Sequence, residues 1–176
     1  MFSDPEQNIE QFGLKKGDCV ADFGAGTGFY SFAAAEAVGE SGKVYSIDVQ
    51  KDLLQKLKNE ARNVRHLSNV EIVWGDLENL GGTRLRDNSL DAVIVANVFF
   101  QLEKKDNTCL EIKRILKNEG RVLFVDWSSS FGGMRPQPSD IFYPEKAEEI
   151  FTKHGFIKDG EIDSGAHHYG LIFKKK

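Results

Sequence analysis

The sequence predicts an α/β fold in which a mostly parallel sheet carries helices on both faces. Short apolar runs, which are typical of buried strands, alternate along the chain with segments of helical periodicity. Such strand–helix–strand units connect parallel strands through right-handed crossovers. Acidic or amide residues follow several apolar runs, and in a doubly wound fold the carboxyl ends of the strands converge on one crevice.

Length and composition limit the class of protein. The 176 residues suffice for one domain with a full core, so we expect a single domain over residues 1–176. With 40% hydrophobic and 28% charged residues, the balance is that of an ordinary globular protein. The formal charge of −4 argues against a protein that grips a nucleic acid backbone, because that function needs clustered positive charge.

The sequence also indicates where the protein operates. No basic segment followed by an apolar stretch opens the chain, and no apolar run approaches the roughly 18 residues of a membrane span. Cys19 and Cys109 lie far apart, with no cysteine or histidine near them at metal-ligand spacing. We therefore expect a cytoplasmic protein with reduced thiols, no disulfide and no structural metal.

The first half of the chain predicts a short helix followed by two strand–helix units. Asp4 and Pro5 are a helix-start signal, and Gly13 ends the helix that they begin. Each strand is an apolar run; of the two helices that follow strands, 27–38 is rich in alanine and 50–65 repeats leucine at helical spacing. The predicted elements are, in order, Pro5–Phe12, Cys19–Phe23, 27–38, Lys43–Asp48 and 50–65.

The second half continues the alternation and closes with a hairpin. Residues 91–96 form an almost unbroken apolar run, as expected of a central strand that is covered on both faces. Segment 78–89 is rich in Gly, Asn and Asp and is predicted as loop with one helical turn at most; a turn is predicted at 118–120. The strands are predicted at Val70–Trp74, 91–96, 121–127, 157–163 and 169–174, and the helices at 105–116 and 144–154.

A glycine-rich turn follows the first predicted strand. The strand ends in Asp22, and glycines stand at positions 24, 26 and 28, before a helix that begins near Thr27. Such a turn frees backbone N–H groups and a helix N-terminus to hold an anionic group. A dinucleotide fold would place its third glycine at 29, but Phe29 stands there.

Three further strand ends carry candidate binding residues. Asp48 ends the second strand, where a carboxylate commonly accepts both hydroxyls of a ribose; the alternative is a cap of the next helix. Asp76, with the backbone of Leu77, suits the amine and ring nitrogen of adenine, unless it only forms a turn. Asn97 presents its carbonyl and side chain to the crevice, and Asp22 could accept from a ligand ammonium.

These segments together resemble the successive motifs of the class I S-adenosylmethionine-dependent methyltransferases, in the small-molecule branch that includes quinone-biosynthesis enzymes. The resemblance rests on the pattern Asp-x-Gly-x-Gly-x-Gly from Asp22 to Gly28, and on segments 44–49, 70–77, 91–101 and 115–122. It departs at Glu119, where a glycine often stands.

The resemblance implies a Rossmann-like domain with seven strands in the order 3-2-1-4-5-7-6 and the last strand antiparallel. It implies S-adenosylmethionine as cofactor and a small methyl acceptor. The ribose would be held by Asp48, the adenine amine by Asp76, and the methionine end by the glycine loop. The full set of expected cofactor-binding residues is Asp22, Gly24, Ala25, Gly26, Thr27, Gly28, Asp48, Val49, Asp76, Leu77 and Asn97.

Methyl transfer to an O, N or C nucleophile needs few catalytic side chains, because proximity, alignment and water exclusion supply most of the rate. His168, with His167 beside it, is the expected source of a base, and the alternative is a solvated pair at a hairpin turn. The expected acceptor-contacting residues are Phe99, Phe100, Trp127 and Tyr169, although aromatic residues are also common in cores. Tyr30 is a further aromatic candidate.

Two other function classes remain open at this point. One is an NAD(P)-dependent oxidoreductase, and the other is a protein that binds the cofactor without turnover. The sequence also does not decide what covers the acceptor, because only some eighteen residues precede the first strand. The site could be open and accept a large substrate, or a second subunit of a homodimer could cover it. Alternatively, residues 1–13 and segment 128–144 could suffice for a small acceptor, with segment 128–144, which holds three of the four prolines, as a lid.

Overall fold

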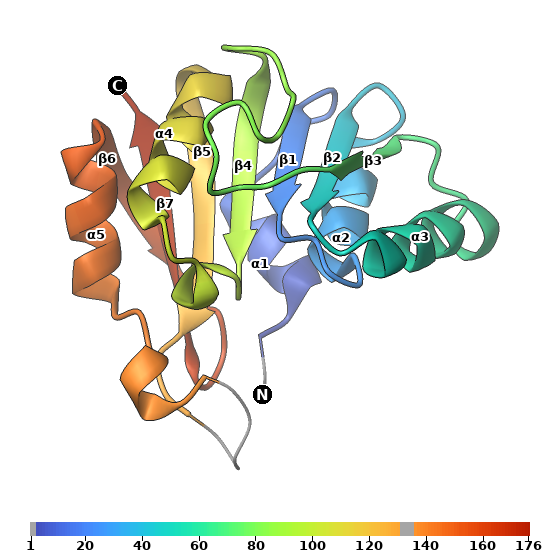
Figure 1. Ribbon diagram of the computed structural model, residues 1–176. Coiled ribbons are helices and arrows are strands. Elements are labelled where there is room, and N and C mark those ends of the chain that lie inside the picture. Colours follow the sequence, from blue (N-terminus) through green and yellow to red (C-terminus); the bar gives the residue numbers. More distant parts are fainter. Residues whose placement is uncertain (1–2, 131–135) are drawn as a thin grey trace.

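The computed structural model describes residues 3–130 and 136–176, and these form one seven-stranded sheet flanked by helices (Figure 1). The strands are β1 (Cys19–Phe23), β2 (Lys43–Asp48), β3 (Val70–Trp74), β4 (Leu90–Ala96), β5 (Leu116–Trp127), β6 (Phe156–Ile162) and β7 (His168–Lys175). The α-helices are α1 (Pro5–Phe12), α2 (Phe29–Val38), α3 (Lys51–Asn59), α4 (Lys105–Ile115) and α5 (Pro144–Lys153). Shorter helical segments are η1 (Glu60–Val64), η2 (Phe99–Gln101) and η3 (Pro138–Asp140).

The strand order is β3-β2-β1-β4-β5-β7-β6, which confirms the order that the resemblance implied. The pairs β1–β2, β2–β3, β1–β4 and β4–β5 are parallel. The last strand, β7, is antiparallel to both β5 and β6, so it is inserted between them. The antiparallel direction follows from the short connection between β6 and β7, which leaves no room for a crossover helix.

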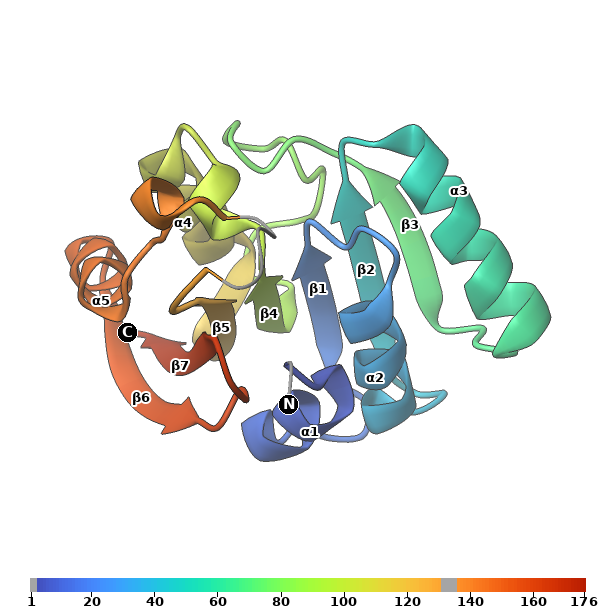
Figure 2. The ribbon, with the colours of Figure 1, turned by 90° about the horizontal axis from the view of Figure 1, so that it is seen from below.

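Two hydrophobic cores cover the two faces of the sheet. Strand β4 contributes side chains to both cores, because successive side chains of a strand point to opposite faces of the sheet. Val93 and Val95 pack with α4 and α5, whereas Ile94 packs with α1, α2 and α3. Figure 2 shows these two groups of helices on opposite sides of the sheet. The long apolar run of this strand is therefore buried on both sides, as the sequence predicted.

Three predicted elements differ from the structure by more than one residue at an end, and the other differences are of a single residue. Helix α2 begins at Phe29 rather than at 27, because Gly28 caps it with a left-handed backbone (φ 93°). The predicted helix 50–65 is α3 followed by a π-helical turn, η1. The predicted turn at 118–120 lies inside β5, where the pairing with β4 jumps from Leu116 to Arg121 and Glu119 has a φ of 64°.

Candidate functional site

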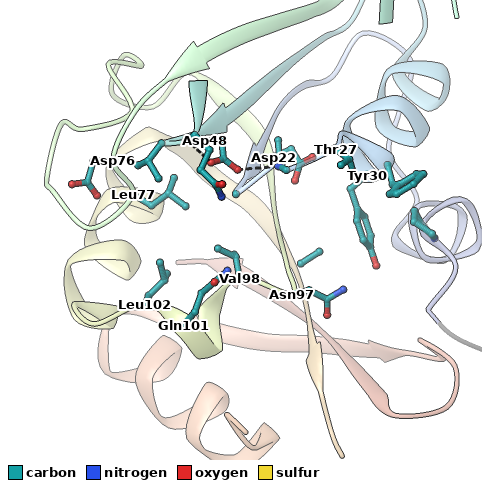
Figure 3. A pocket seen from close by; sticks show the side chains of 18 of the residues that line it. Asp22, Thr27, Tyr30, Asp48, Asp76, Leu77, Asn97, Val98, Gln101 and Leu102 are labelled. Atoms are coloured by element: carbon teal, nitrogen blue, oxygen red, sulfur yellow. Dashed lines mark hydrogen bonds between the residues drawn. The ribbon is translucent and has the colours of Figure 1, made fainter. Parts of the chain in front are cut away.

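A cavity of about 730 Å³ lies at the carboxyl ends of β1, β2, β3 and β4 (Figure 3). All the expected cofactor-binding residues except Gly28 line it. Asp76 and Leu77 lie at one end and Tyr30 at the other, with Asp48 and Asp22 between them (Figure 3). Residues that stand up to 75 positions apart in the sequence, from Asp22 to Asn97, are thus brought together by the parallel strands.

The fold adds lining residues that the sequence reasoning missed. Some of them adjoin predicted residues, and neighbourhood alone could have found them: Phe29, Gln50, Glu78, Ala96 and Val98. Gln101 and Leu102 come from the turn after β4, Ser3 from the segment before α1, and Pro5 from its first position. Placing Gln101 and Leu102 requires the conformation of this turn. Placing Ser3 and Pro5 requires the packing of α1 against α2.

Gly24 and Gly28 are required by close packing as well as by backbone conformation. A Cβ on Gly24 (φ 73°) would lie 2.6 Å from Cγ2 of Val98. A Cβ on Gly28 (φ 93°) would lie 2.7 Å from Leu57 and Phe32 side-chain atoms. Gly28 is therefore a closely packed residue at the start of α2, and it does not line the cavity.

Asp48 ties the end of β2 to the glycine loop. Its Oδ2 accepts from the backbone N–H of Gly26 at 3.0 Å, and its Oδ1 accepts from that of Gln50 at 2.8 Å. Gln50 is the N-cap residue of α3, so Asp48 holds the residue that precedes this helix but is not itself the cap. A carboxylate has about four acceptor sites, so these two contacts leave capacity for a ligand.

Asp22 is a buried carboxyl at the end of a chain of hydroxyl groups. Ser46 donates to Ser31 at 2.7 Å, and Ser31 donates to Oδ2 of Asp22 at 2.6 Å. Burial, with a smaller contribution from the charge of Asp48, raises the pKa of Asp22 to about 6. Both serines are buried in the structure, and both stand in largely apolar segments of the sequence, so a search for isolated polar residues in such segments could have found them.

Asp76 and Asn97 lie in the wall with different surroundings. Asp76 is exposed and closes a turn, since it accepts from Glu78 N at 2.9 Å and from Nδ2 of Asn79 at 2.6 Å. Asn97 has a left-handed backbone (φ 55°) and donates its N–H to Val125 O at 2.9 Å. Its side-chain Oδ1 is buried and has no hydrogen-bond partner among the described residues.

The aromatic residues expected to contact an acceptor are not among the residues that line the cavity. Phe99 is fully buried in the core, 5.1 Å from the ring of Phe124, because the η2 turn directs it inward. The backbone N–H of Phe100 donates to Asp126, and the hydroxyl of Tyr169 donates to Phe142 O. For Phe99 this placement corrects the expectation of a ligand contact in the cavity.

His167 and His168 also lie outside the cavity wall. Nδ1 of His167 is 2.7 Å from Oγ of Ser129. The ring of His168 packs on Trp127 at 4.2 Å, its Nδ1 is 3.3 Å from Ala166 O, and its Nε2 is buried with no partner among the described residues. Burial lowers the pKa of His168, so its neutral form is favoured.

The segment expected to act as a lid, 128–144, is described only in part, because residues 131–135 lie outside the described chain. Ser128 N donates to His167 O at 2.8 Å, and Ser130 Oγ donates to Pro136 O at 2.8 Å. The described part thus begins beside the predicted histidines. Across residues 3–130 and 136–176, no helix has the length and apolar character needed to cross a bilayer.

Comparison with known proteins gives matches over most of the chain. The family described as Methyltransferase domain matches residues 14–159. The ubiquinone/menaquinone biosynthesis C-methyltransferase UbiE of Cronobacter sakazakii is 28% identical over 92% of this chain and 61% of its own length. UbiE of Escherichia coli strain K12 is 30% identical over 89% of this chain and 59% of its own length. The chain thus spans about three fifths of these relatives.

Two solved structures show how widely the architecture is shared. A SAM-dependent methyltransferase from Aquifex aeolicus superposes with a TM-score of 0.89 at 28% identity, covering 99% of this chain and 91% of the other. The [4+2]-cyclase SpnF superposes with a TM-score of 0.82 at 18% identity, covering 97% and 80%. The second likeness concerns the fold alone.

Proposed function

This chain belongs to the methyltransferase-domain family of S-adenosylmethionine-dependent methyltransferases, and on that premise we propose that the strand-end cavity holds the cofactor while a small molecule accepts its methyl group. One observation carries the proposal. The glycine loop and polar side chains from four strand ends converge on a single cavity, although they were selected from sequence alone.

The residues of the cavity fit the proposed cofactor chemically. Asp48 and Asp76 offer acceptors for ribose hydroxyls and the adenine amine, and the Gly24–Gly26 turn brings backbone close to the ligand. The Asp22 carboxylate suits the ammonium group of the cofactor. Oδ1 of Asn97, which has no partner among the described residues, can accept a hydrogen bond from a ligand. The cofactor, when bound, supplies an activated methyl group; the chain's own contribution is to orient the reactants and exclude water.

The rival functions receive no support. A dinucleotide-dependent oxidoreductase would need glycine where Phe29 stands, and Phe29 is an exposed residue of the cavity rim. Calorimetric titration separates the candidates: S-adenosylmethionine or its demethylated product binds in the micromolar range, and NAD shows no comparable binding. Methyl release with a panel of acceptors then tests turnover.

We further propose the roles of the histidines, of the loop after β5 and of the acceptor. His168 acts as the base, with His167 beside it; segment 128–144 closes over the acceptor; and the chain functions as one domain in the cytoplasm, alone or as a homodimer. The acceptor is a small molecule, and the name of the UbiE relatives makes a carbon acceptor in a quinone precursor the first compound class to assay. The shared sequence motifs support that choice.

Removing the Asp48 carboxylate tests the ribose assignment. Asp48→Ala should weaken binding of S-adenosylhomocysteine by about 1 to 3 kcal/mol, or about 5- to 150-fold, because it removes the acceptors for two hydroxyls and the contact to Gly26 N. Calorimetry measures the change. Asp52→Ala, an exposed carboxylate in the first turn of α3, is the matched control. Normal binding by the Asp48 variant would contradict the assignment.

The buried Asp22 predicts a pH-dependent affinity for a cationic ligand. The pKa of Asp22 is raised to about 6, so the group loses its charge as the pH falls below that value. S-adenosylmethionine should therefore bind about tenfold more weakly at pH 5 than at pH 7.5, since a neutral carboxyl no longer attracts the ammonium. Asp48 and Tyr30 are the titratable residues that line the cavity near Asp22. Asp22→Asn should flatten the profile; an unchanged profile would remove Asp22 from the ammonium site.

A further inference from the structure

One side of helix α4 holds the connection between β3 and β4. Lys104, Asn107, Glu111 and Arg114 stand three or four positions apart along the helix and its N-cap, so they share one side. Each of the four makes at least one hydrogen bond to residues 78–87 of the connection. Figure 1 shows this connection leaving β3 and crossing the sheet toward α4. The position of these residues therefore depends on α4 as well as on the strands.

Glu78 is the first point of attachment, and it belongs to the cavity wall. Its side-chain Oε1 accepts from the backbone N–H of Lys104, and its carbonyl oxygen accepts from Nδ2 of Asn107 at 3.0 Å. The backbone N–H of Glu78 in turn donates to Oδ1 of Asp76 at 2.9 Å. Two successive hydrogen bonds therefore connect Asn107, which does not line the cavity, to the carboxylate that we propose for the adenine amine.

Glu111 is the second point of attachment. Its buried carboxylate accepts from the backbone N–H groups of Gly81 and Thr83 at 2.7 and 3.2 Å. Arg114 donates to both of its oxygens, at 2.9 and 2.7 Å. Burial by itself would raise the pKa of Glu111, but the hydrogen bonds from Arg114, Thr83 and Gly81 outweigh burial and lower it. Glu111 is therefore ionised at neutral pH, and its hydrogen bonds to the connection are charge-assisted.

The segment that Glu111 holds packs closely against the backbone of Asp76. A Cβ on Gly82, in that segment, would lie 2.0 Å from Asp76 O. A Cβ on Gly75 would lie 2.7 Å from Gly82 O. Because no gap separates these two stretches of backbone, a shift of the segment held by Glu111 must also move Asp76.

Helix α4 also adjoins the facing wall of the cavity. Leu102 lines the cavity and stands two residues before Lys104, the N-cap of α4. Figure 3 shows Leu102 and Leu77 on facing sides of the cavity, at the end where Asp76 lies. Because Glu78 also contacts Lys104, α4 joins the two walls at this end.

We propose that Asn107 and Glu111 are positioning residues that set the preference of the cavity for adenine over other purine bases. The proposal rests on the proposed cofactor function. Neither side chain lines the cavity, so both act through the connection that carries Asp76, Leu77 and Glu78. Hydrogen bonds weaken steeply when their geometry departs from the optimum, so a displaced connection loses base recognition first.

Two purine bases present opposite hydrogen-bonding patterns to this wall. Adenine offers an amine donor and an acceptor at N1, whereas hypoxanthine offers a carbonyl acceptor and an N1–H donor. The carboxylate of Asp76 and the backbone N–H of Leu77 match adenine and oppose hypoxanthine. The proposed ribose and ammonium partners, Asp48 and Asp22, belong to other strands, so loosening the connection should reduce the preference between bases more than the affinity they share.

Calorimetric titration of the full chain with two ligands tests the proposal. S-inosylhomocysteine differs from S-adenosylhomocysteine only in carrying hypoxanthine in place of adenine. The unmodified chain should bind the adenine compound more tightly. Asn107→Ala should reduce the ratio of the two affinities by about two- to tenfold, the effect of one weakened hydrogen bond. An unchanged ratio, whether or not both affinities fall, overturns the proposal.

Asp106→Ala is the matched control. Asp106 is the neighbour of Asn107 in α4, but its carboxylate contacts Lys153 and His154 instead of the connection. This variant loosens α4 elsewhere, so it should leave the ratio of the two affinities unchanged. A decrease as large as that of Asn107→Ala would overturn the proposal, because any loosening of α4 would then suffice.

Glu111→Gln tests the second point of attachment. It keeps the shape of the side chain and removes its charge, so it should lower the same ratio and also the melting temperature of the free chain. Thr83→Val removes only the hydroxyl donor to Glu111 and serves where Glu111→Gln does not fold. An unchanged ratio in the folded variant overturns the role of Glu111.

The unmodified chain separates this inference from the proposed function. Failure to bind S-adenosylhomocysteine would overturn the cofactor site itself. Equal binding of the two ligands would overturn the assignment of Asp76 to adenine, and the positioning role with it. Preference for adenine in the unmodified chain, reduced by Asn107→Ala and kept by Asp106→Ala, supports the role of α4.

Discussion

Replacing His168 with glutamine lowers the rate of methyl transfer by about a hundred- to ten-thousandfold, the usual contribution of a positioned acid or base. The side chain has the features of a neutral base. Its Nδ1 contacts Ala166 O, Trp127 packs on the ring, and Nε2 is buried without a partner in the described chain. The rate constant kcat, measured with an acceptor found by the panel assay, reports the loss.

The affinity for the cofactor separates a catalytic role from a structural one. S-adenosylhomocysteine should bind the His168→Gln variant as it binds the unmodified chain, because His168 does not line the cavity. Since burial lowers the pKa of His168, the unmodified enzyme should lose activity only at acid pH, as the imidazole takes up a proton. His66→Asn, at an exposed position with φ 56°, is the control. An unchanged kcat would make His168 a hairpin residue only.

Replacing Asp126 with asparagine removes much of the pH dependence of stability. Asp126 is fully buried, and burial raises its pKa to about 7, although Trp127 and Phe100 donate backbone hydrogen bonds to it. Between its unfolded value of 3.8 and about 7, the folded protein holds this proton more tightly than the unfolded chain does. The free energy of unfolding therefore falls as the pH rises through this window.

The expected size of this effect is about 4 kcal/mol, from a pKa difference of about three units at 1.36 kcal/mol each. Urea unfolding at a series of pH values between 4 and 8 measures it. Asp22 contributes a change of the same sign up to about pH 6, so Asp126→Asn retains part of the slope and Asp22→Asn is the companion variant. Identical slopes in Asp126→Asn and the unmodified protein would contradict the buried-charge account.

Local sequence patterns sufficed for most of the fold. Strands β1, β2 and β3 occupy their predicted bounds, because each is an apolar run with a clear polar or glycine ending. The errors occur where neighbouring elements decide the outcome. The segment from 117 to 120 joins β5 because its pairing with β4 resumes only at Arg121, and no local pattern signals a long-range register shift.

By itself, the sequence determined the strand ends and therefore most of the residues that we propose for the cofactor. Asp22, Asp48, Asp76 and Asn97 were found because parallel strands deliver their carboxyl ends to one place, so position along the chain implies position in space. The rest of the cavity wall depended on the tertiary structure. Only packing shows that Phe99 turns inward while Gln101 lines the cavity, and that α1 brings Asn8 beside Tyr30. Those contacts join segments that share no local pattern, and burial and hydrogen bonding across the assembled core decide them.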